Sequence, residues 1–243
     1  MLCLRYGDHP SQVGDLHLPA RAGSAPVAVL LHGGYWRERY ARSLNDALAR
    51  DLAERGWAAW NLEYRRVGGG GGWPATAIDV GAGVDHLAGL AADHRLDLRR
   101  VVAIGHSAGG QLALWAAARA GAGVPVTAAV SQAGLADLRD AALRGLSDGA
   151  AALFLGGSPE AVPAAYAAAS PLALLPLGIP QLVVHGDRDE AVPVELSRTY
   201  VAAARAAGDS VDYAEFPGCG HMEHLDPSSA AWATVTAWLL RAR

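Results

Sequence analysis

The chain has 243 residues, which is enough for one large α/β domain with a substantial core. Its formal net charge is −4 and no long run of one sign occurs, which excludes the basic patterns typical of nucleic-acid and anionic-membrane binding. The N-terminus lacks a basic segment followed by an apolar one, and no apolar run approaches the ~18 residues of a membrane helix. We therefore expect a cytoplasmic protein with neither a nucleic acid nor a membrane as its partner.

Segments typical of strands alternate with segments typical of helices almost throughout the chain. The predicted strands are Val27–His32, Ala58–Tyr64, Arg100–Gly105, Thr127–Gln132, Gln181–His185 and Val211–Phe216. The predicted helices are Ser43–Arg55, Ala75–Asp93, Ala108–Ala120, Val194–Ala207 and Ser228–Leu240. This alternation predicts βαβ units and an α/β fold, with a mainly parallel sheet covered by helices on both faces.

Two segments interrupt this alternation. Gly68–Gly72 is a run of five glycines, and because no P-loop lysine follows it, we interpret it as a surface turn. The segment 135–171 is rich in alanine and lies between two predicted strands, which predicts a small helical cap inserted over the sheet. We expect residues 1–243 to form a single domain that carries this cap.

The segment Val101–Gly110 predicts a strand, a sharp turn and a helix with Ser107 at the apex of the turn. Glycines at 105 and 109 allow the chain to reverse closely around a residue in a strained conformation. Such a nucleophile elbow exposes the serine hydroxyl and places the start of a helix beneath it. Ser107 is therefore the predicted nucleophile.

A serine nucleophile needs a base, and the base needs an orienting acid. The predicted base is His221, because it directly follows the glycines of a loop after the last predicted strand; His224 is its rival. The predicted acid is Asp189, with Asp187 of the same loop as the alternative. A metal site at the two histidines lacks helix spacing and a third ligand, so we expect no metal.

The order Ser107, Asp189, His221 along the chain is the order of α/β-hydrolases. An oxyanion hole requires backbone amides near the nucleophile. We expect these amides from Ala108, which follows the serine, and from a glycine turn after the first long strand. In that turn we expect Gly33 to shape the backbone and the amides of Gly34 and Tyr35 to point toward the reacting carbonyl.

Aromatic residues near these turns are candidates for the substrate pocket. Trp36 and Trp73, together with Tyr35, are predicted to form an aromatic wall, and the cap segment around Phe154 is predicted to close it. Arginines at loop ends could bind a substrate carboxylate, although such arginines are usually solvated; they are Arg37, Arg65 and Arg66.

Taken together, these motifs resemble the α/β-hydrolase superfamily over essentially the whole chain. Within it, His32–Trp36 resembles the oxyanion motif of the kynurenine formamidase (arylformamidase) branch and its esterase relatives. Hormone-sensitive-lipase-like enzymes more often have a third glycine where this chain has tyrosine. Gly105–Gly110, Glu63–Arg66 and Gly218–His221 fit the same group. General esterases and peptidase-like relatives also share the pattern, but such peptidases usually carry a large extra domain, of which this sequence shows no sign.

The resemblance implies a triad of Ser107, Asp189 and His221, with Gly33, Gly34 and Ala108 around the oxyanion. The chain is thus predicted to be a serine hydrolase that cleaves a small carboxylic ester through an acyl-enzyme, without a metal or organic cofactor. The alternative substrate is a formamide such as N-formylkynurenine. A non-catalytic ligand-binding protein is the hypothesis from another class, and a homodimer is possible for this fold.

Overall fold

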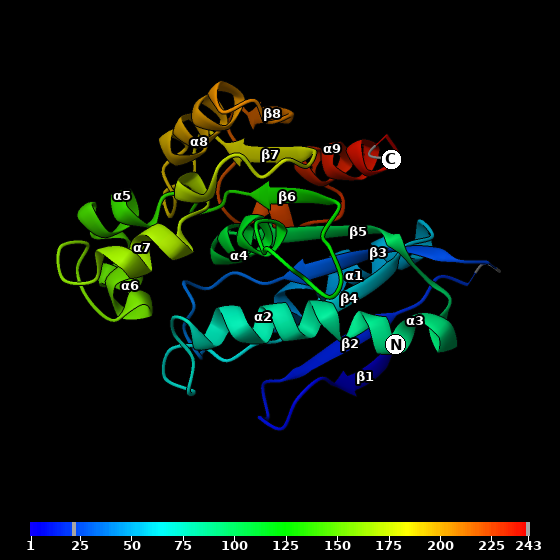
Figure 1. Cartoon of the computed structure of the whole chain (residues 1–243). Coiled ribbons are helices and arrows are strands. Elements are labelled where there is room, and N and C mark those ends of the chain that lie inside the picture. Colours follow the sequence, from blue (N-terminus) through cyan, green and yellow to red (C-terminus); the bar gives the residue numbers. More distant parts are fainter. Residues whose placement is uncertain (21–22, 242–243) are drawn as a thin grey trace.

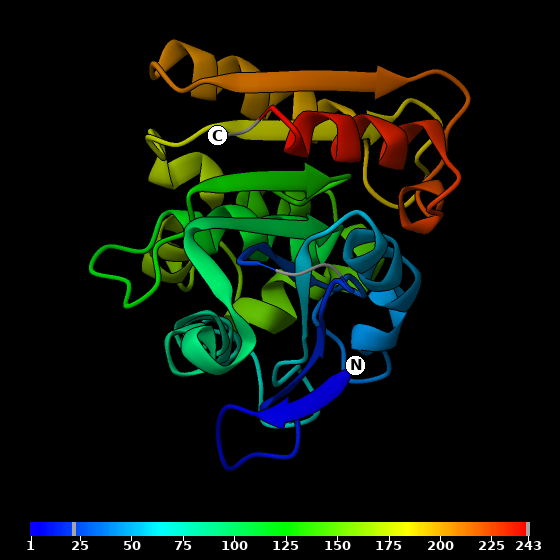
Figure 2. The ribbon, with the colours of Figure 1, turned by 90° about the vertical axis from the view of Figure 1, so that its right-hand side faces the viewer.

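The computed structural model describes residues 1–20 and 23–241 (Figure 1). The strands of this part are β1 (Leu2–Arg5), β2 (Val13–His17), β3 (Ala25–Leu31), β4 (Ala58–Leu62), β5 (Leu96–His106), β6 (Ala128–Gln132), β7 (Gln181–Gly186) and β8 (Val211–Phe216). They form one eight-stranded sheet in the order β1-β2-β4-β3-β5-β6-β7-β8, with β1 at one edge and β8 at the other (Figure 2). From β4 to β8 in this order every neighbouring pair is parallel. The predicted mainly parallel sheet is thus confirmed.

The sequence patterns did not predict the two antiparallel strands at the N-terminus. β1 pairs with β2, and β2 pairs with β4. β1 is mostly exposed, and β2 contains Gly14 and Asp15, so neither strand has the continuous apolar character of the central strands. Both are recognisable only through their pairing with a strand that is already part of the sheet.

The central strand β3 is apolar at every position because helices cover both faces of the sheet. In β3, Val27, Val29 and Leu31 pack into the core on one face. Ala28 and Leu30 point to the opposite face and pack into a second core. Alternate side chains of a strand point to opposite faces, so every position of β3 is buried and favours an apolar residue.

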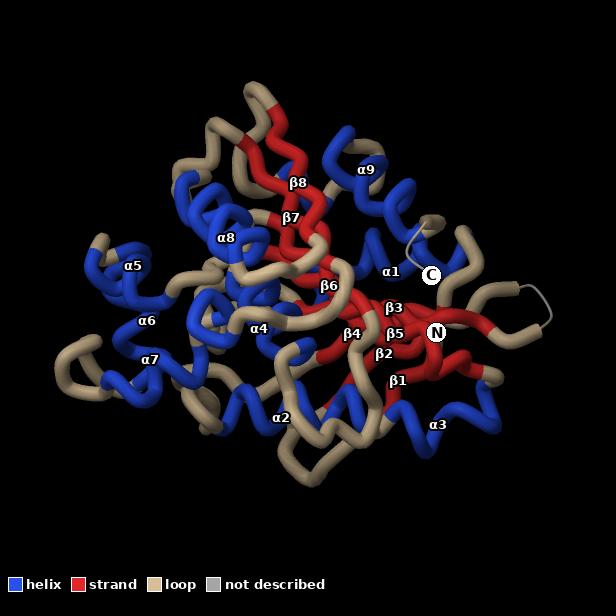
Figure 3. Tube along the Cα trace, turned by 45° about the horizontal axis from the view of Figure 1, so that its top comes forward, coloured by secondary structure: helices blue, strands red, loops and turns tan. Residues whose placement is uncertain are grey.

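The helical segments of the described chain are η1 (Arg42–Asn45), α1 (Asp46–Glu54), α2 (Ala75–Asp85), α3 (Leu87–His94), α4 (Ala108–Ala117), α5 (Leu138–Leu143), α6 (Leu146–Leu155), α7 (Pro163–Ala169), η2 (Pro171–Leu174), α8 (Glu195–Ala206), η3 (Glu223–Leu225) and α9 (Ala230–Leu239). α1 and α9 lie on one face of the sheet, and α2, α4 and α8 lie on the other (Figure 3). None of the helices in the described ranges combines the length and apolar character needed to cross a bilayer.

The inserted segment 135–171 folds as a small group of helices, α5, α6 and α7, beyond the carboxyl ends of the central strands (Figure 1). Several contacts dock this group on the rest of the molecule, and two of them involve Phe154 and Ala169. The ring of Phe154 stacks on Trp36 with centroids 4.4 Å apart, and the side-chain amide of Gln111 donates to the carbonyl of Ala169 at 2.8 Å. The carboxyl ends of the strands and these helices together form the surroundings of the site.

Candidate active site

Ser107 lies at the turn between β5 and α4 with φ 57° and ψ −122°, a strained conformation for a residue other than glycine. At this turn the chain passes very close to β3, and glycine makes that close passage possible. A Cβ on Gly109 would lie 2.0 Å from the carbonyl oxygen of Leu31, so only glycine fits there. The Ser107 amide donates to the Gln132 carbonyl at 2.8 Å and ties the turn to β6. Packing therefore holds the strained serine at the strand end.

His221 and Asp189 form a hydrogen-bonded pair next to this turn. The Nδ1 atom of His221 lies 2.6 Å from Oδ2 of Asp189. The other carboxylate oxygen, Oδ1, accepts the amides of Ala191 and Val192 at 2.9 and 2.8 Å. Because an ionised carboxylate only accepts hydrogen bonds, Nδ1 of His221 carries the proton and Nε2 keeps a lone pair. The imidazole is thus held in the tautomer that a general base requires.

A second histidine, His185, supports the same carboxylate. Its Nε2 lies 2.9 Å from the carbonyl oxygen of Val192 and 3.2 Å from Oδ2 of Asp189, and its Nδ1 lies 2.7 Å from the hydroxyl of Ser197. Burial alone would raise the pKa of Asp189, but hydrogen bonds from His185 and His221 outweigh it and hold this pKa well below its ordinary value. Asp189 is therefore ionised at neutral pH.

One cavity of about 160 Å³ brings the nucleophile and the base together. Its described lining comprises Gly34, Tyr35, Tyr40, Leu44, His106, Ser107, Ala191, His221 and Met222. Four of the predicted site residues are in this list: Gly34, Tyr35, Ser107 and His221. Asp189 lies behind His221, and its side chain is fully buried. Sequence reasoning did not find Tyr40 and Leu44, because no motif marks a residue that only shapes a cavity wall.

The turn after β3 lies directly against the elbow. A Cβ on Gly33 would lie 2.9 Å from the His106 carbonyl oxygen and 3.0 Å from Cβ of Ser107, which explains the glycine at this position. The next residues, Gly34 and Tyr35, have φ of 111° and 50°. Within the described ranges, the amides of Gly34, Tyr35 and Ala108 donate to no protein acceptor. These amides are available to a developing oxyanion.

A buried ionic group anchors this turn. Nε2 of His32 lies 2.8 Å from Oε1 of Glu63, and the His32 carbonyl oxygen accepts the hydroxyl of Tyr64 at 2.6 Å. Glu63 also pairs with Arg66. Glu63 and Tyr64 directly follow β4, the parallel neighbour of β3, so the two strand ends place them beside His32. The sequence signal for this supporting role was that His32, Glu63 and Tyr64 all lie at the ends of predicted strands.

Of the aromatic residues predicted to wall the pocket, Tyr35 lines the cavity and the others lie elsewhere. Trp36 is only 1% exposed, stacks on Phe154, and donates its indole N–H to Gln111 at 3.1 Å. Trp73 meets Phe154 edge-on with centroids 6.4 Å apart. The described lining of the cavity includes none of Trp36, Trp73 and Phe154. In place of the predicted wall, these rings form an aromatic cluster that joins the inserted helices to the core.

The three arginines considered for a substrate carboxylate all make contacts within the protein. Arg65 forms a two-pronged ion pair with Asp79, with N–O distances of 2.7 and 2.8 Å. Arg66 pairs with Glu63, and Arg37 donates to the backbone carbonyl of Ser147. These contacts occupy the three guanidinium groups. The structure therefore gives no support to the idea that these arginines bind a substrate carboxylate.

The rivals for the base and the acid occupy other positions. Asp187 accepts the amide of Gly218 at 2.6 Å, a contact that ties its loop to the loop after β8. His224 is fully buried, and neither of its ring nitrogens has a protein partner among the described residues. Burial, reinforced by His185 and His221, lowers the pKa of His224 to about 4. His224 is thus a neutral residue behind the cavity.

This buried histidine makes stability depend on pH. Folding keeps His224 unprotonated down to about pH 4, whereas in the unfolded chain it takes up a proton below its ordinary pKa of 6.5. Its contribution to stability is therefore complete above pH 6.5 and is lost as pH falls toward 4. Relative to the wild type, His224→Phe is expected to gain about 2 kcal/mol of unfolding free energy between pH 7.5 and pH 5.

Urea unfolding followed by tryptophan fluorescence, run on both proteins at the two pH values, measures this gain. Phenylalanine retains a flat ring of similar size, so each protein serves as the other's control for packing. A difference in unfolding free energy that stays the same at pH 7.5 and pH 5 would show that His224 titrates alike in the folded and unfolded chain.

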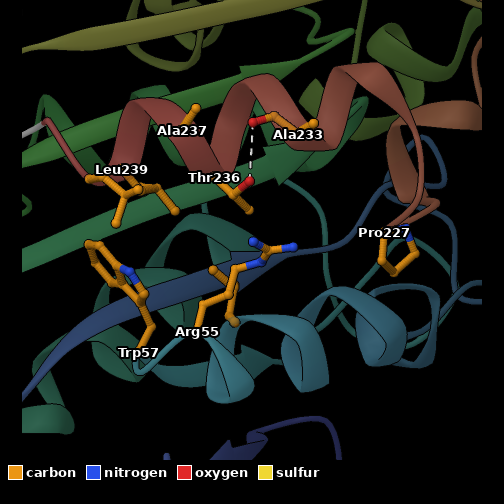
Figure 4. Close-up of a pocket in the computed structure, with 9 residues that line it drawn as sticks. Arg55, Trp57, Pro227, Ala233, Thr236, Ala237 and Leu239 are labelled. Carbon is orange, nitrogen blue, oxygen red and sulfur yellow. Dashed lines mark hydrogen bonds between the residues drawn. The ribbon is translucent and has the colours of Figure 1, made fainter.

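A larger groove of about 340 Å³ lies between α1 and α9 (Figure 4). Trp57 and Arg55 lie below it, and Ala233 and Thr236 of α9 lie above it. Its described lining contains no histidine, carboxylate or serine, so it lacks the groups that acyl transfer requires. Among the described residues, no cluster of histidine, cysteine and carboxylate side chains is suited to a metal ion. The cavity at Ser107 is therefore the candidate active site.

Several solved structures share this fold. A truncated carbohydrate esterase from gut microbiota matches with a TM-score of 0.88 and 21% identity, over 100% of this chain and 95% of that one. An esterase from Thermogutta terrifontis, solved with propionate bound, matches with a TM-score of 0.80 and 21% identity, over 99% of this chain and 93% of that one. The predicted α/β-hydrolase fold is confirmed.

Two curated relatives come from Mycobacterium tuberculosis. Esterase LipC is 30% identical over 89% of this chain and 58% of its own length, and esterase LipQ is 30% identical over 81% of this chain and 50% of its own length. The chain thus spans about half the length of the curated relatives it matches. The names of these relatives are those of esterases and do not single out the arylformamidase branch. Residues 15–203, most of the chain, match the BD-FAE family, and the protein therefore belongs to this family.

Proposed function

We propose that this chain is a carboxylic ester hydrolase that works through an acyl-enzyme on Ser107. The observation that carries the proposal is the His221–Asp189 pair, joined at 2.6 Å, with His221 lining the same cavity as the strained Ser107. Membership of the BD-FAE family and the esterase names of the relatives support the same reaction class. The mechanism calls for no metal or organic cofactor.

In the acylation step, the Ser107 hydroxyl attacks the ester carbonyl carbon while Nε2 of His221 accepts its proton. Asp189 stabilises the imidazolium that forms. The amides of Gly34, Tyr35 and Ala108 donate to the oxyanion, and α4 begins at Ala108, so its dipole adds to this stabilisation. His221 then protonates the leaving alcohol. In deacylation it activates a water molecule in the same way, and the acid is released.

The character of the cavity favours a neutral ester over an amino-acid formamide. N-formylkynurenine, the formamide considered above, carries a carboxylate. The described lining of the cavity contains no arginine or lysine to pair with that group, and the nearby Arg37 and Arg66 are bound within the protein. Without such a partner the carboxylate gains no ion pair in the site, so nothing in the described lining raises kcat/KM for this formamide.

Wild-type protein is therefore expected to hydrolyse p-nitrophenyl acetate or butyrate with a kcat/KM at least about 100-fold above that for N-formylkynurenine, a gap worth about 2.7 kcal/mol of transition-state binding. Steady-state kinetics on the three substrates measures the gap. The protein is also expected to be labelled covalently by a fluorophosphonate.

Two results would contradict this reading in different ways. If kcat/KM were instead about 100-fold higher for N-formylkynurenine than for the esters, the protein would be an arylformamidase acting through the same nucleophile. Folded protein that hydrolyses neither class and resists the fluorophosphonate would instead be a non-catalytic binding protein.

A further inference from the structure

The wall of the active-site cavity has two unlike sides. On one side, His221 is followed by Met222, whose side chain is 56% exposed. On the other side, Tyr40 packs on the oxyanion turn so closely that a Cβ on Gly34 would lie 2.4 Å from its ring. Leu44 of η1 is half-buried and lines the same cavity. Met222 is thus the exposed part of the cavity wall, and Tyr40 and Leu44 belong to its packed part.

The proposed reaction assigns one part of an ester to each side. The alcohol takes its proton from His221 and must leave, so it belongs on the exposed side with Met222. The acyl group stays bound to Ser107 until water releases it. We assign the acyl chain to the packed part of the lining, formed by Tyr40 and Leu44.

Two hydrogen bonds hold the segments around the cavity in place. The Tyr35 hydroxyl donates to the Ala191 carbonyl at 2.5 Å and joins the oxyanion turn to the loop that carries the acid. Burial, together with the charge of Asp189, raises the pKa of Tyr35 to about 12, so this hydroxyl remains a donor at neutral pH. The start of η1 is held where the Arg42 amide donates to Glu63 at 3.0 Å.

We propose that Leu44 and Tyr40 close the acyl side of the cavity and restrict the enzyme to esters of short acids, up to about six carbon atoms. This inference rests on the function proposed above. The limit follows from the volume: a cavity of about 150 Å³ holds one benzene molecule, and this cavity measures about 160 Å³. A longer chain would have to displace Leu44 or Tyr40.

The test is a series of p-nitrophenyl esters from acetate to octanoate, measured as kcat/KM with wild type, Leu44→Ala and Leu44→Phe. Wild type is expected to prefer butyrate over octanoate by about tenfold or more. Leu44→Ala should lower this ratio by about tenfold, and Leu44→Phe should move the optimum to acetate. The matched control is Leu143→Ala, which truncates a leucine that is 65% exposed on α5, outside the cavity, and should leave the ratio unchanged.

A parallel series keeps acetate as the acid and lengthens the alcohol from ethyl to octyl. If the Leu44 variants change how kcat/KM depends on alcohol length and do not change how it depends on acyl length, the cavity holds the alcohol and the proposal is overturned. Octanoate turned over as well as butyrate by wild type would overturn it too, while leaving the proposed esterase function intact. Absence of both ester hydrolysis and fluorophosphonate labelling would overturn the proposed function itself, and the acyl assignment with it.

Discussion

Replacing Ser107 by alanine is expected to lower kcat/KM for p-nitrophenyl butyrate by about 10⁴-fold or more, because no other group in the site can form the acyl-enzyme. Alanine keeps the Cβ atom and adds no bulk, so the tight packing around the turn is preserved. The variant should therefore fold normally. Steady-state kinetics, with circular dichroism as the check on folding, measures both expectations.

Ser210→Ala is the matched control, because it removes the hydroxyl of an exposed serine that precedes β8 and lies outside the cavity. It should leave kcat/KM within about twofold of wild type. Fluorophosphonate labelling should persist in Ser210→Ala and disappear in Ser107→Ala. If folded Ser107→Ala kept more than a tenth of the wild-type rate, the acyl-enzyme mechanism would be wrong.

Asp189→Asn is expected to lower kcat by about 10³- to 10⁴-fold, as in other enzymes where the triad acid becomes an amide. The geometry supplies the reason. Oδ1 of Asp189 accepts two backbone amides, from Ala191 and Val192, so the amide oxygen of asparagine must occupy that place. The new NH₂ group then faces His221, whose Nδ1 has to accept. The proton moves to Nε2, and the base loses the lone pair that it needs.

The control is Asp187→Asn in the same loop, since Asp187 accepts only the exposed amide of Gly218 in the described structure. It should change kcat by less than about tenfold. A larger loss from Asp187→Asn than from Asp189→Asn would reverse the assignment of the acid.

Features that depend on neighbours in the sequence could be predicted without a structure. The strand, glycine turn and helix around Ser107 are local, and so is the glycine turn at Gly33 and Gly34. The alternation of strand-like and helix-like segments predicted the parallel sheet, and the apolar residues of β3, Ala25–Leu31, are covered on both faces as that sheet requires. Chain order then placed Asp189 and His221 after later strands of the same sheet, where parallel strands end at one edge.

Contacts between distant segments were decided only by the tertiary structure. The sequence alone cannot show that the Asp189 carboxylate reaches His221 while Asp187 reaches a backbone amide, because both lie in one loop. Nor does it show that Trp36, beside the oxyanion turn, stacks on Phe154 of the inserted helices and is not part of the described cavity lining.

The same distinction explains the parts of the fold and site that sequence patterns did not reveal. β1 and β2 are strands because they pair with a neighbour, and Leu44 lines the cavity because η1 packs against β3 and β4. Local backbone geometry and the alternation of buried side chains are encoded over a few residues, so the sequence determined the fold class and the chemical parts of the site. The direction of each side chain depends on what packs against it, and only the tertiary structure decided that.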